Sequence, residues 1–264
     1  MLSVISPAKR LNESQPGPDD GLSLTEPLFA KEAMRLVQAA RKLSVEDLRR
    51  LMDLSDPLAR LNRDRFHAYR RRPSAEAVFP AIHCFAGDTY LGLDAASMSP
   101  DGLRRASGHL RILSGLYGLL RPFDAIQPYR LEMGSRLATP GGADLYAFWG
   151  DRIARALRAA AMAAGTDVLV NCASVEYFAA ADRKALKLRV VTPVFLEGRE
   201  GDAKVVSFFA KKARGAMARY ICENHLTDPA DLRGFSTGGY GYRADLSKED
   251  RLVFQRDAAE AVAA

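Results

Sequence analysis

Short runs of apolar residues predict the strands of a sheet. They are Leu2–Ser6, Leu110–Leu113, Asp167–Val170, Arg189–Phe195 and Lys204–Phe208. Because the apolar residues are consecutive rather than alternate, we expect strands that are buried on both faces. Between these runs, apolar residues recur at helical spacing over Leu145–Ala164 and Ala210–Asn224. The alternation predicts an α/β (mixed α+β) fold in which helices flank a mixed central sheet.

A second pattern, near the N-terminus, predicts helices without intervening strands. Apolar residues recur at helical spacing over Lys31–Leu43. Ser44 is placed to cap a second helix, with Asp47 three residues later. Asn62 is placed to cap a third helix, after a break at Ser55-Asp56-Pro57. We expect these helices to form an appendage on the sheet.

The chain shows no sign of division into domains. The stretch Glu13–Gly21 contains prolines and glycines, which predicts a loop between the first strand and the helices rather than a domain linker. No internal repeat or low-complexity tract interrupts the sequence. We therefore expect residues 1–264 to form a single domain.

Composition narrows the class of protein. No apolar run approaches the roughly 20 residues of a membrane span, and the N-terminus lacks the pattern of a signal peptide. The three cysteines, Cys84, Cys172 and Cys222, form no C-x-x-C pair, and no two of the four histidines stand four residues apart. We therefore expect a cytoplasmic protein with no membrane partner, no metal site and no cofactor.

Positive charge is concentrated in three parts of the chain. The net charge is +6, and residues 41–72 contain ten Lys and Arg against five Asp and Glu. Residues 204–219 contain five basic residues and no acidic one, and residues 103–136 contain six arginines against two carboxylates. Such clusters favour a polyanionic partner, and we expect them to line one continuous groove.

The chain has no phosphate-binding loop, dinucleotide-binding glycine motif or nucleophile elbow. Candidate functional residues must therefore be sought at the ends of the predicted strands.

Lys9 is the first candidate functional residue. Pro7 ends the first predicted strand because it has no N–H to donate. Ligands of open α/β sheets bind beyond the carboxyl ends of strands. Lys9 therefore faces a crevice or, alternatively, is an ordinary surface lysine.

Two further segments follow predicted strands. Ser114–Gly134 combines glycines, which allow close approach to an anion, with Arg121, Arg130 and Glu132; the alternative is a turn with an Arg–Glu ion pair. Asn171–Phe178 places an amide, a hydroxyl and the Glu176 carboxylate where they can contact a base edge or a water. The alternative there is a helix cap with a solvated carboxylate.

Lys211 and Lys212 stand at the start of the last long predicted helix. Positive charge in a first turn opposes the helix dipole, so this position favours anion binding over a plain solvated face. We expect Lys9, Glu176 and Lys211 to converge, because each adjoins the end of a predicted strand. With Glu132, Lys9 and Glu176 are candidates for nucleophilic or general-base chemistry, and the alternative is a structural ion pair.

These segments together resemble the YaaA family over nearly the whole chain. Six short motifs, in the family's order, carry the resemblance: Ile5–Lys9, Leu113–Gly118, Pro128–Gly134, Tyr146–Gly150, Ala173–Phe178 and Phe209–Gly215. The resemblance implies a curved mixed sheet, a positively charged cleft and a helix-hairpin-helix element that binds DNA. It also implies survival of peroxide stress by limiting damage from free iron.

The helix-hairpin-helix element implied by the resemblance maps onto Ser44–Tyr69, with its hairpin at Ser55–Leu61. Such hairpins contact backbone phosphates and read no bases. This hairpin lacks the glycines that are usual in the family, so arginines are expected to supply phosphate contacts instead. The expected DNA-binding residues of the whole chain are Arg49, Arg50, Arg60, Arg63, Arg65, Arg121, Arg130, Lys211, Lys212 and Arg214.

Three functions remain open from the sequence. The first is a stress protein that binds double-stranded or structured DNA through its phosphates. The second is an enzyme that acts on a nucleotide or flipped base in a crevice containing Lys9, Arg121, Glu132, Glu176 and Lys211, with a nucleotide-like small molecule as its ligand. The third, direct iron sequestration, is the least supported, because the dispersed histidines and cysteines leave only carboxylate ligands.

Overall fold

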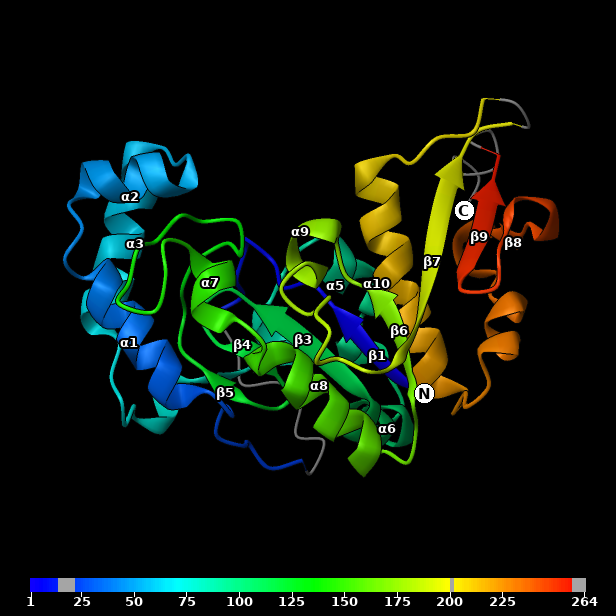
Figure 1. The fold of residues 1–264 in the computed structure, drawn as a ribbon, viewed down its shortest axis with the longest axis horizontal. Helices are drawn as coiled ribbons and strands as arrows, with labels where there is room; N and C mark the ends of the chain where they lie inside the picture. Colours follow the sequence, from blue (N-terminus) through cyan, green and yellow to red (C-terminus); the bar gives the residue numbers. More distant parts are fainter. Residues whose placement is uncertain (14–21, 200–201, 258–264) are drawn as a thin grey trace.

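The computed structural model describes residues 1–13, 22–199 and 202–257, and within them the centre is a seven-stranded sheet ordered β4-β3-β1-β6-β7-β9-β8 (Figure 1). The inner strands β3, β1, β6, β7 and β9 are parallel, and the edge strands β4 and β8 are antiparallel to their neighbours. A small antiparallel pair joins β2 to β5. The strands are β1 (Leu2–Ile5), β2 (Phe79–Pro80), β3 (Leu110–Ser114), β4 (Gly118–Leu120), β5 (Ala125–Ile126), β6 (Val168–Cys172), β7 (Arg189–Glu197), β8 (Gly241–Tyr242) and β9 (Arg251–Arg256). The predicted α/β fold with a mixed central sheet is confirmed.

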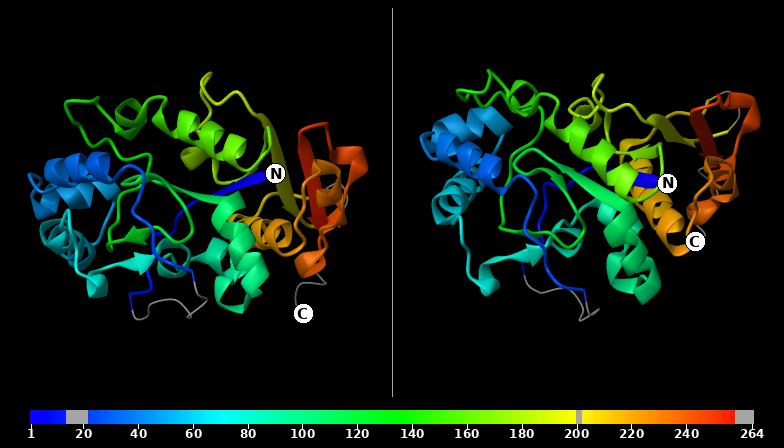
Figure 2. Two further views of the ribbon diagram at one scale, coloured as in Figure 1. Left: turned by 90° about the horizontal axis from the view of Figure 1, so that it is seen from below. Right: turned by 60° about the horizontal axis from the view of Figure 1, so that its bottom comes forward.

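Helices cover both faces of the sheet: α8 lies over one face, and α5, α6 and α10 lie over the other (Figure 2). Among the described residues, no helix is long and apolar enough to cross a membrane. The α-helices are α1 (Ala30–Ala40), α2 (Val45–Met52), α3 (Asp56–Ala68), α4 (Ala81–Cys84), α5 (Asp88–Leu93), α6 (Pro100–His109), α7 (Leu145–Trp149), α8 (Arg152–Ala163), α9 (Val175–Phe178) and α10 (Ser207–Glu223). Short 3₁₀ turns span Ala75–Ala77, Ala95–Ser97, Pro229–Gly234, Thr237–Gly239 and Ala244–Leu246.

The central strands are buried on both faces, which accounts for their continuous apolar sequence. Every residue of β1 and of β6 is buried, as expected for strands with helices on both faces. The long helix predicted over Leu145–Ala164 is two helices, α7 and α8, because Gly150 between them adopts a positive φ of 49°. Of the predicted loop over Glu13–Gly21, residues 14–21 lie outside the described part of the chain.

The strand predicted over Lys204–Phe208 is wrong. Lys204 makes only an isolated bridge with Glu197, and helix α10 already begins at Ser207. The apolar residues there are not a buried strand, since Val205 is 53% exposed and Phe208 is 49% exposed. Lys211 therefore lies in the second turn of α10 rather than at its start.

The helices near the N-terminus differ in detail from the expected hairpin. Ser44 caps α2 as predicted: its side chain accepts from the N–H of Asp47, whose carboxylate accepts from the N–H of Ser44. The hairpin predicted over Ser55–Leu61 is wrong, because α3 begins at Asp56. Pro57 fits the first turn, where no N–H is needed. Asn62 is buried inside α3 and caps nothing; its amide donates to the Leu58 carbonyl.

Helices α5 and α10 approach so closely that only glycine fits at their crossing. A Cβ added to Gly215 of α10 would lie 1.7 Å from the carbonyl oxygen of Thr89. A Cβ on Gly92 of α5 would lie 1.9 Å from the carbonyl oxygen of Lys212. Because both obstructions are backbone atoms, the helices would have to separate to admit a methyl group. This contact fixes the start of α5 against the part of α10 that carries Lys211.

The crossing predicts opposite effects for two glycine-to-alanine substitutions in helices. We expect Gly215→Ala to lower the free energy of unfolding by roughly 1–3 kcal/mol, because the methyl group overpacks the contact. Gly108→Ala, in α6, meets nothing within 4 Å and should raise stability by about 0.4–1 kcal/mol through reduced chain entropy. Chemical denaturation of the three proteins measures both changes. Equal effects of the two substitutions would contradict the close crossing.

Candidate functional site

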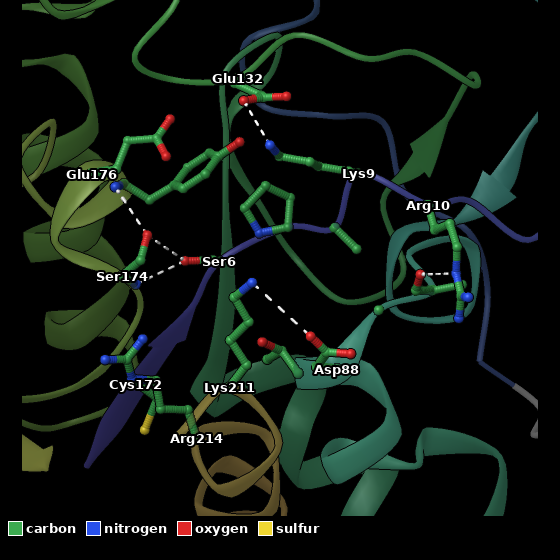
Figure 3. A pocket seen from close by; sticks show the side chains of 16 residues that line it. Ser6, Lys9, Arg10, Asp88, Glu132, Cys172, Ser174, Glu176, Lys211 and Arg214 are labelled. Carbon is green, nitrogen blue, oxygen red and sulfur yellow. Dashed lines mark hydrogen bonds and ion pairs between the residues drawn. The ribbon is translucent and has the colours of Figure 1, made fainter. Parts of the chain in front are cut away.

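A pocket of about 480 Å³ opens beyond the carboxyl ends of the parallel strands β1 and β6 (Figure 3). The two strands pair with Ile5 opposite Cys172, so the residues that follow each strand emerge side by side. This is where ligands of open parallel sheets bind. The polar and charged residues that line the pocket are Ser6, Lys9, Arg10, Asp88, Thr89, Glu132, Ser174, Glu176, Tyr177, Lys211 and Arg214.

The predicted convergence of distant residues is present. Lys9, Glu176 and Lys211 line the same pocket, together with Glu132. The Lys9 Nζ lies 3.1 Å from Glu132 Oε2, and the Lys9 side chain is 65% exposed. Arg130 also pairs with Glu132 at 2.9 Å. Glu132 thus holds two cations at the rim, an arrangement that fits either the structural ion pair or the chemical role.

The turn after β6 is fixed to the end of β1 by serine hydrogen bonds. The N–H of Ser174 donates to Ser6 Oγ at 2.9 Å, and Ser174 caps the short helix α9. Glu176 follows on that helix and is held in place: its Oε1 accepts from the N–H of Gly134 at 2.9 Å, and its carbonyl accepts from the Tyr146 hydroxyl. The helix cap with an exposed carboxylate, the alternative for this segment, is therefore present, and Glu176 also borders the pocket.

Helix α10 supplies two cations on the opposite side of the pocket from Glu132 and Glu176 (Figure 3). Lys211 Nζ lies 4.0 Å from Asp88 Oδ2, the limit of an ion pair. Arg214 is partly buried, and no described residue forms a hydrogen bond or ion pair with it. Burial lowers the pKa of the Arg214 guanidinium. Lys212, although next to Lys211, does not line the pocket.

Arg121 does not line this pocket. The predictions that it shares a crevice with Lys9 and that all three basic clusters line one groove are therefore wrong for Arg121. Strand β3 ends at the pocket side of the sheet, and β4 runs back antiparallel to it. Arg121 therefore emerges at the opposite edge, where it lines a second pocket beside α1 and α8. Its guanidinium is engaged there by Asp124 at 2.9 Å and by the carbonyl of Glu26 at 2.7 Å.

The arginines expected on the helix pair each lie beside a carboxylate. Residues 44–69 contain five arginines and five carboxylates, so the local excess of charge comes from the flanking residues 41–42 and 70–72. Two of those flanking arginines, Arg41 and Arg70, donate to carbonyls at the end of α3. The ion pairs of the helix pair are Arg49–Glu46, Arg50–Asp47, Arg60–Asp56, Arg63–Asp64 and Arg65–Glu13. DNA binding by this element remains a prediction.

Two charged residues of the pocket, Arg10 and Asp88, were not predicted from the sequence pattern. Arg10 directly follows Lys9, and its Nε donates to the Ala86 carbonyl, which ties the β1 exit to the start of α5. Asp88 reaches the site only because α5 packs on α10. The glycines Gly92 and Gly215, each inside a helix, are the one sequence signal of that packing.

Metal and thiol chemistry have few candidates in the described part of the chain. No group of three or more His, Cys, Asp or Glu residues is placed there to hold a metal ion. All three cysteines are free and buried. Burial raises the pKa of the Cys84, Cys172 and Cys222 thiols to about 12 each.

These features define an α/β protein with a pocket lined by charged residues of both signs at the carboxyl edge of its parallel strands. Residues 1–246 match the family model described as peroxide stress protein YaaA. The chain is 59% identical to a UPF0246 protein of Ruegeria pomeroyi over 97% of its own length and 98% of the relative's. It is 59% identical to one of Cereibacter sphaeroides over 97% and 99%. A third, from Jannaschia sp., is 54% identical over the whole of both chains. The chain therefore belongs to the YaaA peroxide stress family.

The buried thiols predict resistance to the oxidant. A thiol with a pKa of about 12 is almost entirely protonated at pH 7, and the thiolate is the reactive form. We expect hydrogen peroxide followed by dimedone to leave the folded protein unlabelled by mass spectrometry. The same treatment in guanidinium chloride should modify all three cysteines. Rapid labelling of the native protein would show that a thiol is accessible and ionised.

Proposed function

We propose that this protein acts in the peroxide stress response by binding DNA through phosphates, with one unstacked nucleotide entering the pocket. The observation that carries the proposal is Arg214, a partly buried guanidinium that faces the pocket without a counter-charge among the described residues. A buried charge is costly unless it is paired. A phosphate group is a natural partner, since arginine binds it bidentately.

The charges around Arg214 support an anionic ligand. The pocket is lined by four cations and three carboxylates. Lys211, 51% exposed and only loosely held by Asp88, is able to turn to a phosphate without losing a strong ion pair. A volume of about 480 Å³ suits a nucleotide and excludes a duplex. DNA would therefore enter with a nucleotide unstacked, at a cost that is smallest where pairing is already lost.

The helix pair α2–α3 is a second candidate contact with DNA. Its ion pairs join exposed side chains, for example Arg60 at 65% and Asp56 at 53%. Exposed ion pairs of this kind contribute little stability, so each arginine is able to exchange its carboxylate for a phosphate. The helix-hairpin-helix role implied by the sequence motifs would add contacts with the DNA backbone outside the pocket.

Phosphate binding would give a physical mechanism for protecting DNA from peroxide damage. Lysine and arginine that bind DNA displace the cations condensed on it. Ferrous iron held at phosphates would be among the displaced cations, which would move peroxide-dependent radical formation away from the DNA. We place this activity in the cytoplasm, since the free and buried thiols suit a reducing compartment.

An enzyme acting on the bound nucleotide is the second candidate function. Its support is Glu132 at the pocket rim, where Lys9 lies 3.1 Å from the carboxylate, because a carboxylate within reach of a bound nucleotide is placed for general-base chemistry. Turnover of a bulged duplex by the wild type but not by Lys9→Met, with both proteins equally stable, would favour this function. Loss of stability alone would assign the pair to architecture.

Arg214 gives the direct test of DNA binding at the pocket. We expect Arg214→Gln to weaken binding to a duplex with one unpaired nucleotide and to reduce the log–log salt slope by about 0.9, the value of one phosphate contact. Fluorescence anisotropy across a salt series measures both quantities. Arg158→Gln, which removes the same charge from the exposed face of α8, is the control. Equal slopes for the two variants would refute a phosphate contact at the pocket.

The helix pair is tested separately. We expect Arg60→Ala/Arg63→Ala to make the salt slope shallower by up to about 1.8, because two phosphate contacts are removed. Both side chains are exposed, at 65% and 48%, so the fold should be retained, which circular dichroism can verify. An unchanged slope would remove the helix-hairpin-helix assignment and leave the pocket as the site of contact.

A further inference from the structure

The pocket has two chemically different sides. Arg214 and Lys211 extend from α10 on one side, while Glu132 and Glu176 lie on the other (Figure 3). A free phosphate would satisfy the cations and leave the carboxylates facing solvent. The arrangement instead suits an elongated ligand with an anionic group at one end and hydrogen-bond donors at the other.

The two carboxylates are not equally available to a ligand. Glu132 already holds Lys9 at 3.1 Å and Arg130 at 2.9 Å. Glu176 forms no ion pair with any described residue. Its Oε1 accepts one hydrogen bond from the N–H of Gly134, at 2.9 Å. Since a carboxylate has about four acceptor positions, Glu176 retains most of its capacity to accept donors from a molecule in the pocket.

The backbone of Glu176 is fixed by its neighbours, and its side chain is exposed. It lies in the first turn of α9, which Ser174 caps, and Ser174 is tied to the end of β1 through Ser6. The Tyr146 hydroxyl donates to the Glu176 carbonyl at 2.9 Å. A carboxylate at this position favours a ligand N–H over a ligand carbonyl, because two acceptors facing each other lack a proton to share.

We infer that the pocket selects nucleotides whose base carries an amino group at C6 of a purine or C4 of a pyrimidine, as in adenine or cytosine, over their keto counterparts. The phosphate lies at Arg214 and Lys211, and the amino group donates to Glu176. The inference rests on the proposed function, in that it names the nucleotide that enters the pocket. Thymine and uracil present a carbonyl at the position where cytosine has its amino group, and hypoxanthine does so relative to adenine.

Two matched pairs of deoxynucleoside monophosphates test the inference by calorimetry. The wild type should bind dAMP at least about tenfold more tightly than dIMP, and dCMP more tightly than dUMP by a similar factor. In Glu176→Gln the ratios should fall to near one, because glutamine also donates to a carbonyl oxygen. Glu76→Gln, at an exposed position away from the pocket, should leave both ratios unchanged.

Arg214→Gln separates recognition of the phosphate from recognition of the base. It should weaken all four nucleotides by a similar factor and preserve the amino-to-keto ratios. Thermal unfolding of each variant confirms that the fold is retained. Equal wild-type affinities within each pair, or no detectable binding of any mononucleotide, would overturn the inference.

The same variants distinguish failure of the inference from failure of the proposed function. If Arg214→Gln weakens DNA binding but the wild type does not discriminate between dAMP and dIMP, base selection is refuted and DNA binding stands. If the wild type discriminates but DNA binding does not depend on Arg214, the pocket selects free nucleotides and the DNA proposal fails.

Discussion

The parallel pairing of β1 with β6 is the constraint on which the site depends. β1 lies inside the sheet, with β3 on one side and β6 on the other, and all of its residues are buried. Because β6 is in register with it, Ile5 opposite Cys172, the chain leaves both strands at one place. The hydrogen bond from Ser174 to Ser6 Oγ continues the pairing past the strand ends. Lys9 and Glu176 thereby reach one pocket from distant parts of the sequence.

The second half of the site depends on helix packing. Helix α10 crosses the back of β1, β6 and β7 and carries Arg214 into the pocket. Its glycine-mediated contact with α5 brings Asp88 to within 4.0 Å of Lys211. Glu132 and Glu176 thus face Lys211 and Arg214 of α10 across the pocket, with Lys9 paired to Glu132 and Asp88 beside Lys211. The β1–β6 pairing and the α5–α10 crossing therefore determine where the charged side chains of the pocket lie.

The sequence predicted the parts of this arrangement that depend on local pattern. Continuous apolar runs indicated β1, β3 and β6, and the ends of strands located Lys9 and Glu176. Patterns failed where tertiary context decides. Val205 and Phe208 look like strand residues but lie exposed around the start of a helix. Arg121 follows a turn, with Gly118 at a φ of 68°, that reverses the chain and carries it to the far edge. Asp88 depends wholly on packing between helices distant in sequence.

The two edges of the sheet have a consequence for how copies of this protein meet. Edge strand β4 has three residues and β8 has two, and each runs antiparallel to its neighbour. An exposed strand edge is a template on which a second chain can add hydrogen bonds, and short strands limit that template. Each edge offers only a few backbone groups in extended conformation. Aggregation by strand pairing between copies of the protein is therefore disfavoured, even when many copies are present during peroxide stress.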